Sequence, residues 1–491
     1  MENKSLEKII ESRLEKLKKI RDLGVNPYPY EFKCSHTTSQ VTEDIVGKKV
    51  SVAGRVMALR NMGKAAFTNI QDESGRVQLY IAKDNVGENG YNLFKLIDIG
   101  DHIGVSGKIF ITKTGAVTVK VKTLTLLSKN LRPIPDVKEK DGKKYNFVSD
   151  KEFRYRKRYL DLIINPETKE NYVKRFKIVN SIREFLNTNG YIEVETPVLQ
   201  PVYGGANAKP FKTFHNALDQ EFYLRIATEL YLKQLIVGGF EKVYEMSKDF
   251  RNEGIDRSHN PEFTMLEFYQ AYADYNFMMD FVEKMFKKVA NDLDMKIISW
   301  DGHKINLSKK FARKSMDELI QEYTGESVDL SDVKAVLNLC KKLDLKVKKS
   351  DGLAKMIDAI MRKKIEPNLI NPTYVINHPV EISPLAKINR DGDKNFTERF
   401  ELFIVGMEFA NGFSELNDPI DQRNRFEDQS KKREDGDENA FPVDENFLEA
   451  IETGMPPTAG VGVGIDRLVM LFIDTRWIRD AILFPTLKSL K

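Results

Sequence analysis

The hydrophobic pattern of residues 48–128 has a period of two, and no other feature of the sequence constrains the fold as strongly. Apolar and polar residues alternate in five short runs that are separated by turn signals such as DESG and TKTG, as in half-buried β-strands. The runs are VSVAGRVMAL, AAFTNIQ, RVQLYIA, HIGVSGKIFI and VTVKVKTLTLL. Five such strands in one short segment, followed by the proline-containing LRPIPD, predict a small β-barrel of the OB type.

OB-type barrels bind single-stranded nucleic acid through basic and aromatic side chains. Residues 1–150 carry 26 Lys and Arg against 18 Asp and Glu, whereas the remaining residues carry 51 against 55. This excess fits a polyanionic partner and equally a solvated surface. The candidate contacts are Phe67 for base stacking and Arg60, Arg76 and Gln78 for polar contacts. The pattern leaves open whether Phe67 belongs to the core instead.

Residues 4–23 carry apolar residues at steps of three and four, which predicts an amphipathic helix. This helix either packs on its own domain or binds RNA, and NPYPY at 26–30 ends it. No apolar run approaches the ~18 residues of a membrane span, and the charged N-terminus does not resemble a secretory signal. Two cysteines far apart, Cys34 and Cys340, exclude a disulfide framework. We therefore expect a soluble, cytoplasmic, multidomain protein without a membrane partner.

The most informative chemical stretch is FRNEG (250–254), followed by SHNPEFTMLEFYQAY (258–272). An arginine between two predicted strands can clamp an anion through two hydrogen bonds. The acidic residue two positions later, Glu253, can hold an amine or a hydroxyl group. His259 and Phe263 follow on a loop that enters the second strand.

A second stretch, GVGVGIDRLVML, places glycines at 460, 462 and 464. Their spacing differs from GxGxxG and from GxxxxGK[ST], so neither of these nucleotide-binding loops is present. Alternating glycines in an apolar strand predict close backbone approach. The strand leads into a helix opened by Asp466 and Arg467, and an arginine there can meet a phosphate.

A third stretch, RFELFIVGMEFANGFSEL (399–416), contains Glu401 and Glu408. A spacing of seven puts them on opposite faces of one strand, but they converge on a helix or across a bulge. Paired carboxylates favour Mg²⁺. The alternative is that both are ordinary surface glutamates.

In order and spacing, these stretches resemble the three sequence motifs of the class II aminoacyl-tRNA synthetases: Gly190 to Pro197 resembles motif 1, FRNEG with HNPEF motif 2, and GVGIDR motif 3. Within subclass IIb, the sequence is similar to the lysyl-tRNA synthetase family of bacterial type. The further supporting strings are GGANAKPF (204–211), LRIATELYLKQLIVGGFEKVYEM (224–246), EFYQAYADY (267–275) and NGFSELNDP (411–419).

The resemblance implies an α+β fold, with an OB-type barrel and an antiparallel six- to seven-stranded sheet flanked by helices. The implied domains are an N-terminal helix and extension (1–45), an anticodon-binding domain (46–145) and a catalytic domain (146–491). Within the last, we expect motif 1 at about 189–199, motif 2 at about 243–272, a helical insertion at about 310–362 and motif 3 at about 460–472.

The implied reaction joins lysine and ATP into lysyl-adenylate with release of pyrophosphate, and then transfers lysine to the terminal adenosine of tRNA-Lys. The implied cofactor is Mg²⁺, and motif 1 implies a homodimer. Three alternatives remain: a class II paralogue that lysylates a protein, a non-catalytic tRNA-binding derivative, and an asparaginyl- or aspartyl-type enzyme. The barrel argues against the first, both motif arginines argue against the second, and SHNPEF with the implied acidic pocket argues against the third.

The resemblance also implies roles for individual residues. Arg251 and Arg467 would be catalytic, and Glu267 and Glu415 would face the lysine ε-ammonium, whose desolvation requires carboxylates. The residues implied for lysine are Gly205, Glu229, Glu267, Tyr269, Asn411 and Glu415. Those implied for ATP are Arg251, Asn252, Glu253, His259, Asn260, Phe263, Glu408, Gly464, Asp466 and Arg467. Those implied for Mg²⁺ are Glu401 and Glu408, and those for the anticodon are Arg60, Phe67, Arg76 and Gln78. Ala116 stands where bacterial relatives often have an acidic residue, which puts base readout at that position in doubt.

Overall fold

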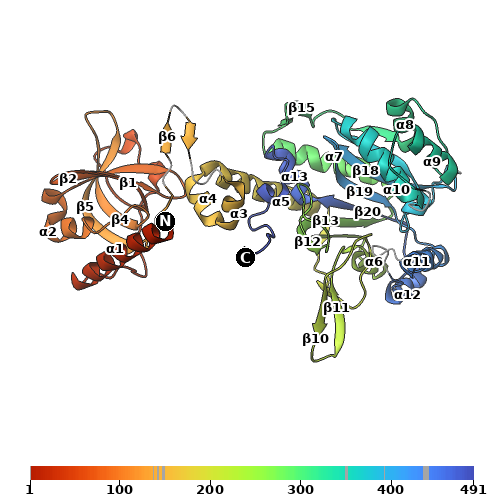
Figure 1. The fold of residues 1–491 in the computed structure, drawn as a ribbon, viewed down its shortest axis with the longest axis horizontal. Coiled ribbons are helices and arrows are strands. Elements are labelled where there is room, and N and C mark those ends of the chain that lie inside the picture. Colours follow the sequence, from red (N-terminus) through yellow and green to blue (C-terminus); the bar gives the residue numbers. More distant parts are fainter. Residues whose placement is uncertain are drawn as a thin grey trace. The chain divides into compact units, whose positions relative to one another are not determined.

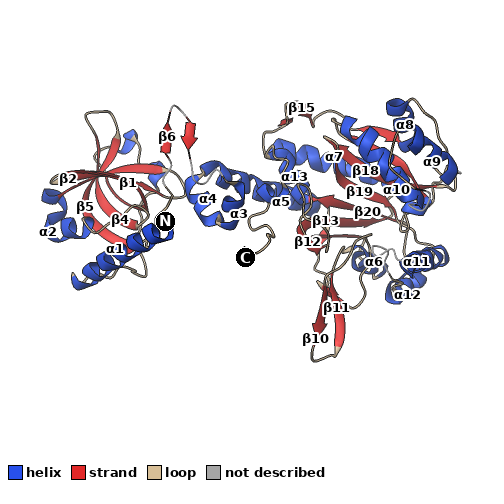
Figure 2. Ribbon diagram, in the orientation of Figure 1, coloured by secondary structure: helices blue, strands red, loops and turns tan. Residues whose placement is uncertain are grey.

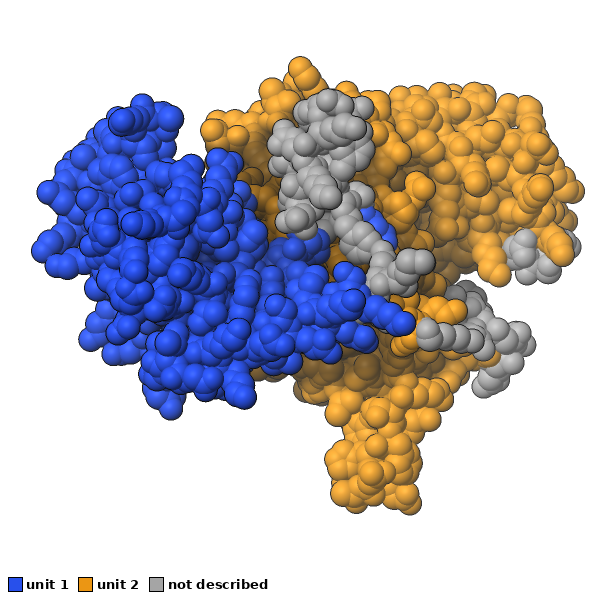
Figure 3. All heavy atoms as spheres, turned by 60° about the vertical axis from the view of Figure 1, so that its left-hand side comes forward, with its two compact units in different colours: residues 1–150 blue, residues 151–491 orange. Residues whose placement is uncertain are grey.

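The structure, a computed structural model, describes residues 2–135, 138–140, 143–145, 150–348, 352–391, 393–434 and 442–490. The chain divides into two compact units, Met1–Asp150 and Lys151–Lys491, which Figure 3 shows in different colours. Among the described helices, none is long and apolar enough to cross a membrane. Each unit has its own hydrophobic core.

The first unit is built on a closed five-stranded barrel with the strand order β1–β2–β3–β5–β4 (Figure 1). Its strands are β1 (Lys49–Met62), β2 (Ala65–Gln71), β3 (Arg76–Ala82), β4 (His102–Ile111) and β5 (Val117–Ser128). All five predicted strands are therefore confirmed. Alternate residues fill the barrel, among them Val52, Ile70 and Leu79, which are completely buried. A parallel pairing of β3 with β5 closes the barrel.

The predicted N-terminal helix is α1 (Glu2–Asp22), and it packs on its own unit. Ile20 is completely buried within the barrel core. Lys16 forms an ion pair with Asp98 at 2.6 Å, and Arg13 donates to the carbonyl of Ile99 at 3.2 Å. Of the two possibilities that the sequence left open, packing on the unit is the one observed.

A second helix of the first unit, α2 (Lys83–Phe94), was not predicted. Gly87 and Gly90 lie inside it, and Gly87 has a φ of 73° that interrupts the helical conformation. Two glycines within twelve residues weaken helix propensity. Contact with the barrel, through the buried Tyr91 and Phe94, compensates for this weakness.

The second unit contains a sheet in the order β16–β17–β18–β19–β20–β13–β12–β8 (Figure 2). Its strands are β8 (Ile192–Glu193), β12 (Lys242–Phe250), β13 (Glu262–Ala271), β16 (Ala312–Ser315), β17 (Thr373–Pro379), β18 (Phe396–Ile404), β19 (Met407–Ser414) and β20 (Thr458–Gly464). The six inner strands, β17 to β12 in this order, pair antiparallel as expected. The edge strands β8 and β16 were not expected, and both pair in parallel. The edge strands have two and four residues, too few to be recognised by alternation.

Helices cover both faces of this sheet. The helices α5 (Pro166–Thr188), α7 (Tyr275–Asp292) and α13 (Ile465–Phe472) share one core with Leu266 and Phe268 of β13. The helix α6 (Glu229–Val237) packs against Tyr269 and Ala271 of the same strand. Because successive residues of a strand point to opposite faces, α6 lies on the other side of the sheet.

The segment predicted as a helical insertion, 310–362, begins with a strand. Ala312–Ser315 forms β16 and pairs in parallel with β17, so the expectation of helix is wrong at that point. The capping box of Ser315 and Glu318 then opens α8 (Met316–Thr324). The helices α9 (Val333–Lys342) and α10 (Gly352–Ile360) follow, and the three helices share a core of their own.

The remaining elements lie around these cores. They are α3 (Lys151–Arg156), α4 (Arg158–Ile164), α11 (Pro419–Glu434), α12 (Glu445–Gly454), α14 (Ile478–Ala481), β9 (Leu199–Gln200), β10 (Lys212–His215), β11 (Gln220–Leu224), and the small hairpins β6 (Lys138–Lys140) with β7 (Lys143–Tyr145) and β14 (Ile297–Trp300) with β15 (His303–Asn306).

Candidate functional site

A cavity of about 540 Å³ lies on the face of the large sheet that α6 covers. Its floor includes β20, whose Gly460, Gly462 and Gly464 stand beside Tyr269, Glu267 and Met265 of β13. A Cβ atom on Gly460 would collide with the Tyr269 ring. The predicted close approach to the strand backbone is thus observed at Gly460, where side chains make it, whereas a Cβ atom on Gly462 or Gly464 would meet nothing nearer than 3.7 Å.

One end of the cavity carries positive charge. Arg251 directly follows β12, and its backbone N–H donates to the carbonyl of Pro261 at 2.9 Å, across the hairpin. Its guanidinium carbon lies 5.1 Å from the centre of the Phe263 ring. Within the described part of the chain, no carboxylate lies within ion-pair distance of Arg251. Its charge is therefore available to an anion that enters the cavity.

Arg467 extends this positive end from the first turn of α13. Its guanidinium donates to the carbonyl of Glu408 at 2.8 Å and lies 3.4 Å from that residue's carboxylate. His259 Nδ1 donates to Asp256 at 2.8 Å, while Nε2 faces Arg467 at 3.4 Å. The Arg467 guanidinium and the His259 imidazole therefore lie next to each other at this end of the cavity.

Asp466 lines the cavity, but its carboxylate is already engaged. Arg175 of α5 donates to Oδ1 at 2.5 Å, and the backbone N–H of Thr264 donates to Oδ2 at 2.7 Å. The residue therefore joins α13 to α5 and β13. This arrangement fixes the start of α13 and, with it, the position of Arg467.

The opposite end of the cavity is acidic and buried. Glu267 accepts the backbone N–H of Thr228 at 3.3 Å and the Tyr269 hydroxyl at 3.1 Å. Burial, together with the carboxylates of Asp249 and Glu229, raises the pKa of Glu267 to about 8. A cation in this pocket would lower that pKa again, so the pocket favours a positively charged ligand.

Glu229 and Glu415 complete the acidic end. Glu229 opens α6 and stands against Gly205, whose φ of 84° is one that other residues rarely adopt. Glu415 lies behind Gly460, whose Cβ position would be 2.5 Å from Glu415 Oε1. Glu415 is 1% exposed, and its Oε1 has no hydrogen-bond partner among the described residues. An unsatisfied buried carboxylate oxygen indicates a missing donor.

Glu401 and Glu408 come together because a bulge corrects their spacing. They lie on the two strands of the β18–β19 hairpin, where Glu401 faces Asn411 and Phe403 faces Glu408, with a register shift between Leu402 and Phe403. The shift returns both glutamates to one face, and both line the cavity. Of the possibilities left open by the sequence, convergence across a bulge is the one observed.

The chemistry of these two side chains fits a hard divalent cation. Both offer carboxylate oxygens, and their charges contribute to raising the pKa of the half-buried Glu366 to about 7, after the larger effect of burial. The described residues contain no group of three or more His, Cys, Asp or Glu side chains arranged to hold a metal ion. A cation here would need further oxygens from water or from a ligand, as Mg²⁺ commonly does.

Most of the residues that the sequence singled out in the second unit line this one cavity. They are Gly205, Glu229, Arg251, Glu253, His259, Asn260, Phe263, Glu267, Tyr269, Glu401, Glu408, Asn411, Gly464, Asp466 and Arg467. Asn252 and Glu415 do not line it. The backbone N–H of Asn252 donates to the carbonyl of Lys209 at 2.7 Å.

Sequence analysis missed two charged residues of the site. Lys233 is completely buried on α6, four residues after Glu229, and this helical spacing was the signal for an ion pair. Arg399 lines the cavity and pairs with Glu401 at 2.6 Å. The signal for Arg399 was its position two residues before Glu401, on the same face of one strand.

A second candidate site lies on the outer face of the barrel. Phe67 is half-buried, outside the core, with its ring 5.1 Å from that of Tyr80. Arg60 of β1 is paired with Phe67 of β2. Arg76 and Gln78 precede Tyr80 on β3 and lie on the same side of that strand. The four residues proposed for nucleic acid therefore share one face of three neighbouring strands.

Comparisons with known proteins match a family model in each unit. The family described as tRNA synthetases class II (D, K and N) matches residues 150–488, and the OB-fold nucleic acid binding domain matches residues 50–127. The chain is 49% identical to the lysine–tRNA ligase of Carboxydothermus hydrogenoformans over 99% of each chain, and 49% identical to that of Moorella thermoacetica over 97% of each. It is 48% identical to that of Enterococcus faecalis, over 97% of this chain and 96% of the relative.

Proposed function

Because the chain belongs to the class II tRNA synthetases (D, K and N), we propose that it is a lysine–tRNA ligase, which activates lysine with ATP and transfers it to tRNA-Lys. The observation that carries this proposal is the charge arrangement of the cavity, with buried carboxylates at one end and the guanidinium groups of Arg251 and Arg467 at the other. Lysine carries two ammonium groups, and ATP carries the negative charge. The acidic end therefore suits the ammonium groups of lysine, and the cationic end suits the phosphates of ATP.

The acidic end selects the amino acid. Glu267 and Glu415 receive the ε-ammonium of lysine beside the Tyr269 hydroxyl, while Glu229 and the carbonyl of Gly205 receive the α-ammonium. Asn411 of β19, which is paired with Gly462 of β20, contacts the substrate carboxylate. An acidic amino acid would be repelled by the same carboxylates, so the pocket also rejects aspartate.

The cationic end binds ATP and supports adenylate formation. The lysine carboxylate attacks the α-phosphorus, the bond to the β-phosphate oxygen breaks, and pyrophosphate leaves. Arg251 neutralises charge at the α-phosphate, and Arg467 and His259 bind the tail of the triphosphate. Phe263 stacks on adenine, with Asn252, Glu253, Asn260, Gly464 and Asp466 around the nucleotide. No protein nucleophile is required, because positioning and electrostatics supply the catalysis.

Mg²⁺ is the proposed cofactor, and Glu401 and Glu408 are the residues that would hold it. Once bound, the ion supplies positive charge beside the phosphates. Arg399 pairs with Glu401 and donates to Asn411 at 3.2 Å, so it fixes two groups of the site relative to each other. The Glu408 carboxylate faces Arg467, which keeps it at the edge of the cavity.

The barrel would bind the anticodon of tRNA-Lys. Within the anticodon-binding domain, proposed as residues 46–145, the outer face with Phe67 and Arg60 offers an aromatic platform and a cation, the two elements of single-strand binding. Gln78 and Arg76 supply polar groups. The turn at Ala116 offers no carboxylate, so base discrimination falls to the Phe67 face.

A homodimer is also part of the proposal. The large apolar side chains exposed on α5, β8 and β9 include Phe176 (50%), Ile192 (51%) and Leu199 (47%). Exposed apolar side chains are what an interface between two subunits would cover. As its partner is tRNA, we place the activity in the cytoplasm.

The proposed function is tested by ATP–pyrophosphate exchange with each of the twenty amino acids, with and without Mg²⁺. We expect exchange with lysine only, and only with Mg²⁺ present. Lysine-dependent charging of a tRNA-Lys transcript then tests the second step. Exchange with another amino acid, or with none, would contradict the proposal.

A further inference from the structure

Lys233 is a completely buried cation beneath the acidic end of the cavity. Its Nζ lies 2.5 Å from Glu229 Oε1, within α6, and it also forms an ion pair with Glu415 Oε2. The rings of Phe413 and Phe447 flank it, with centres 5.4 and 5.7 Å from Nζ. The ammonium therefore joins two carboxylates that would otherwise approach each other without a counter-ion.

A fixed cation at this point is unexpected, because the pocket is proposed to receive further cations. Burying an ammonium group is unfavourable unless carboxylates surround it, and a second ammonium nearby is repelled. The carboxylates at this end are Glu229 of α6 and Glu267 of β13, which line the cavity, and Glu415 after β19. Glu415 lies directly behind Gly460 and interacts electrostatically with both. When all three carboxylates are ionised, the single positive charge of Lys233 leaves a net charge of minus two at this end.

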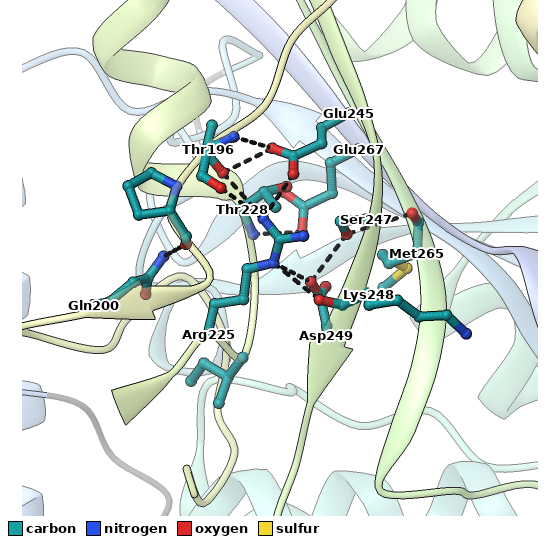
Figure 4. Close-up of polar contacts among 12 residues, drawn as sticks. Thr196, Gln200, Arg225, Thr228, Glu245, Ser247, Lys248, Asp249, Met265 and Glu267 are labelled. Atoms are coloured by element: carbon teal, nitrogen blue, oxygen red, sulfur yellow. Dashed lines mark hydrogen bonds and ion pairs between the residues drawn. The ribbon is translucent and has the colours of Figure 1, made fainter. Parts of the chain in front are cut away.

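The other charged groups around the pocket have partners of their own. Asp249 and Glu245 of β12 share Arg225, at 3.4 and 2.6 Å (Figure 4). Arg399 of β18 pairs with Glu401. The Tyr269 hydroxyl stays neutral, because burial and the nearby carboxylates raise its pKa well above its ordinary value. Glu245 and Asp249 together exceed Arg225 by one negative charge, and Arg251 also acts electrostatically on Asp249. None of these groups neutralises the two negative charges that Lys233 leaves at the acidic end.

We infer that Lys233 is a positioning residue that cancels one of the three carboxylate charges, so that the pocket is neutralised by an amino acid with two ammonium groups. The inference rests on the proposed function and adds a specificity-determining residue to it. Lys233 holds the inner oxygens of Glu229 and Glu415. Glu415 Oε1, which is buried without a hydrogen-bond partner, is left for the substrate.

The protonation behaviour of the cluster supports this role. Burial raises the pKa of Glu415 well above its ordinary value, while the ammonium of Lys233 acts in the opposite direction. In turn, Glu229 and Glu415 overcome desolvation and raise the pKa of Lys233. Without Lys233, Glu415 would bind a proton more tightly. Lysine, which requires the ionised carboxylates, would then have to displace that proton.

The test is the variant Lys233→Met, which has a side chain of similar length without the charge. We expect the KM for lysine in ATP–pyrophosphate exchange at pH 7 to rise about 10²-fold, as for a buried pair that loses one partner, with the KM for ATP unchanged. Between pH 6 and 8.5, log KM for lysine should fall more steeply with pH than in the wild type, by about one further proton. Lys233→Arg keeps the charge and should keep the wild-type slope.

The chain offers a matched control in Lys129, which is equally buried in the first unit and pairs with Asp98 and Asp101 at 2.5 and 2.8 Å. Lys129→Met should lower the melting temperature but leave the lysine KM and its pH slope unchanged. A wild-type pH slope in Lys233→Met, or an equally altered slope in Lys233→Arg, would overturn the inference while lysine-dependent exchange by the wild type upheld the proposed function.

A measurement on the wild type needs no variant to fold. The lysine analogue 6-hydroxynorleucine has a neutral hydroxyl in place of the ε-ammonium, so its binding leaves one carboxylate charge uncompensated. Its inhibition constant should therefore decrease as the pH falls from 8 to 6, whereas the KM for lysine increases. The same pH dependence for both compounds would overturn the inference. Exchange that does not depend on lysine would overturn the proposed function, and the inference with it.

Discussion

The two ends of the cavity differ in charge and also in depth. At the acidic end, Glu229, Glu267 and Glu415 are 6%, 5% and 1% exposed. At the cationic end, the side chains of His259 and Arg467 are 50% and 25% exposed. Charges interact strongly where water is excluded and weakly where it is present. Amino-acid selection therefore depends on the buried end, whereas the open end admits a large, charged nucleotide.

The largest effect is expected at the buried end, from Glu415→Gln. Removing one charge from a buried cluster should lower kcat/KM for lysine in pyrophosphate exchange by about 10²- to 10³-fold. Glu452→Gln provides the control, since Glu452 is exposed on α12 and pairs with Arg423 at 3.2 Å. Unchanged kinetics with lysine in Glu415→Gln would mean that the ε-ammonium binds elsewhere.

At the open end, Arg251→Ala should lower kcat for exchange by about 10²-fold, because one donor to the developing charge is lost. Arg423→Ala, on α11, serves as the matched control, since Arg423 pairs with Glu445 and Glu452 and does not line the cavity. If kcat were retained and only the KM for lysine rose, Arg251 would bind the ground state alone. The open end would then contribute to lysine binding, and the assignment of amino-acid selection to the buried end alone would be wrong.

The pH dependence sharpens the comparison, because Glu267 at the buried end has a pKa raised to about 8 by burial and by neighbouring carboxylates. In the free protein, Glu267 is protonated below this pKa, and lysine needs the ionised form. The affinity for lysine is therefore fully present above about pH 8 and is lost as the pH falls, by up to about tenfold per pH unit. Measured kcat/KM for lysine between pH 6 and 8.5 checks this, and a flat profile would contradict it.

The smallest effect is expected outside the cavity, on the barrel. Phe67→Ala should raise the KM for tRNA-Lys in aminoacylation about 5- to 10-fold, as for the loss of one stacked base. Pyrophosphate exchange without tRNA should not change. Ile111→Ala, which truncates an exposed apolar side chain of the barrel, should leave both activities at the wild-type level. A loss of exchange activity in Phe67→Ala would indicate that the residue does not act through tRNA.

Local patterns in the sequence were sufficient for part of the fold. The five barrel strands and α1 were predicted because alternation and helical spacing are properties of neighbouring residues. The edge strands β8 and β16 were missed because pairing with a distant strand, not their own sequence, determines them. The helix α2 was missed because packing compensates for Gly87 and Gly90.

The candidate site was predictable to a similar extent. Motif residues such as Arg251 and Arg467 were found, and they line the same cavity. Their roles in catalysis remain predictions. The sequence did not show whether Glu401 and Glu408 converge, because their convergence depends on a bulge in the β18–β19 hairpin. Lys233 was missed because an i,i+4 pair on a helix is usually exposed, and only the fold shows that this one is buried.

The most direct test of the account is a crystal structure with a non-hydrolysable lysyl-adenylate analogue. We predict that the ε-ammonium lies within hydrogen-bond distance of Glu267 and Glu415, and that the group replacing the α-phosphate lies against Arg251. An analogue bound in the opposite direction, with its ammonium beside Arg467 and His259, would contradict the assignment of the two ends.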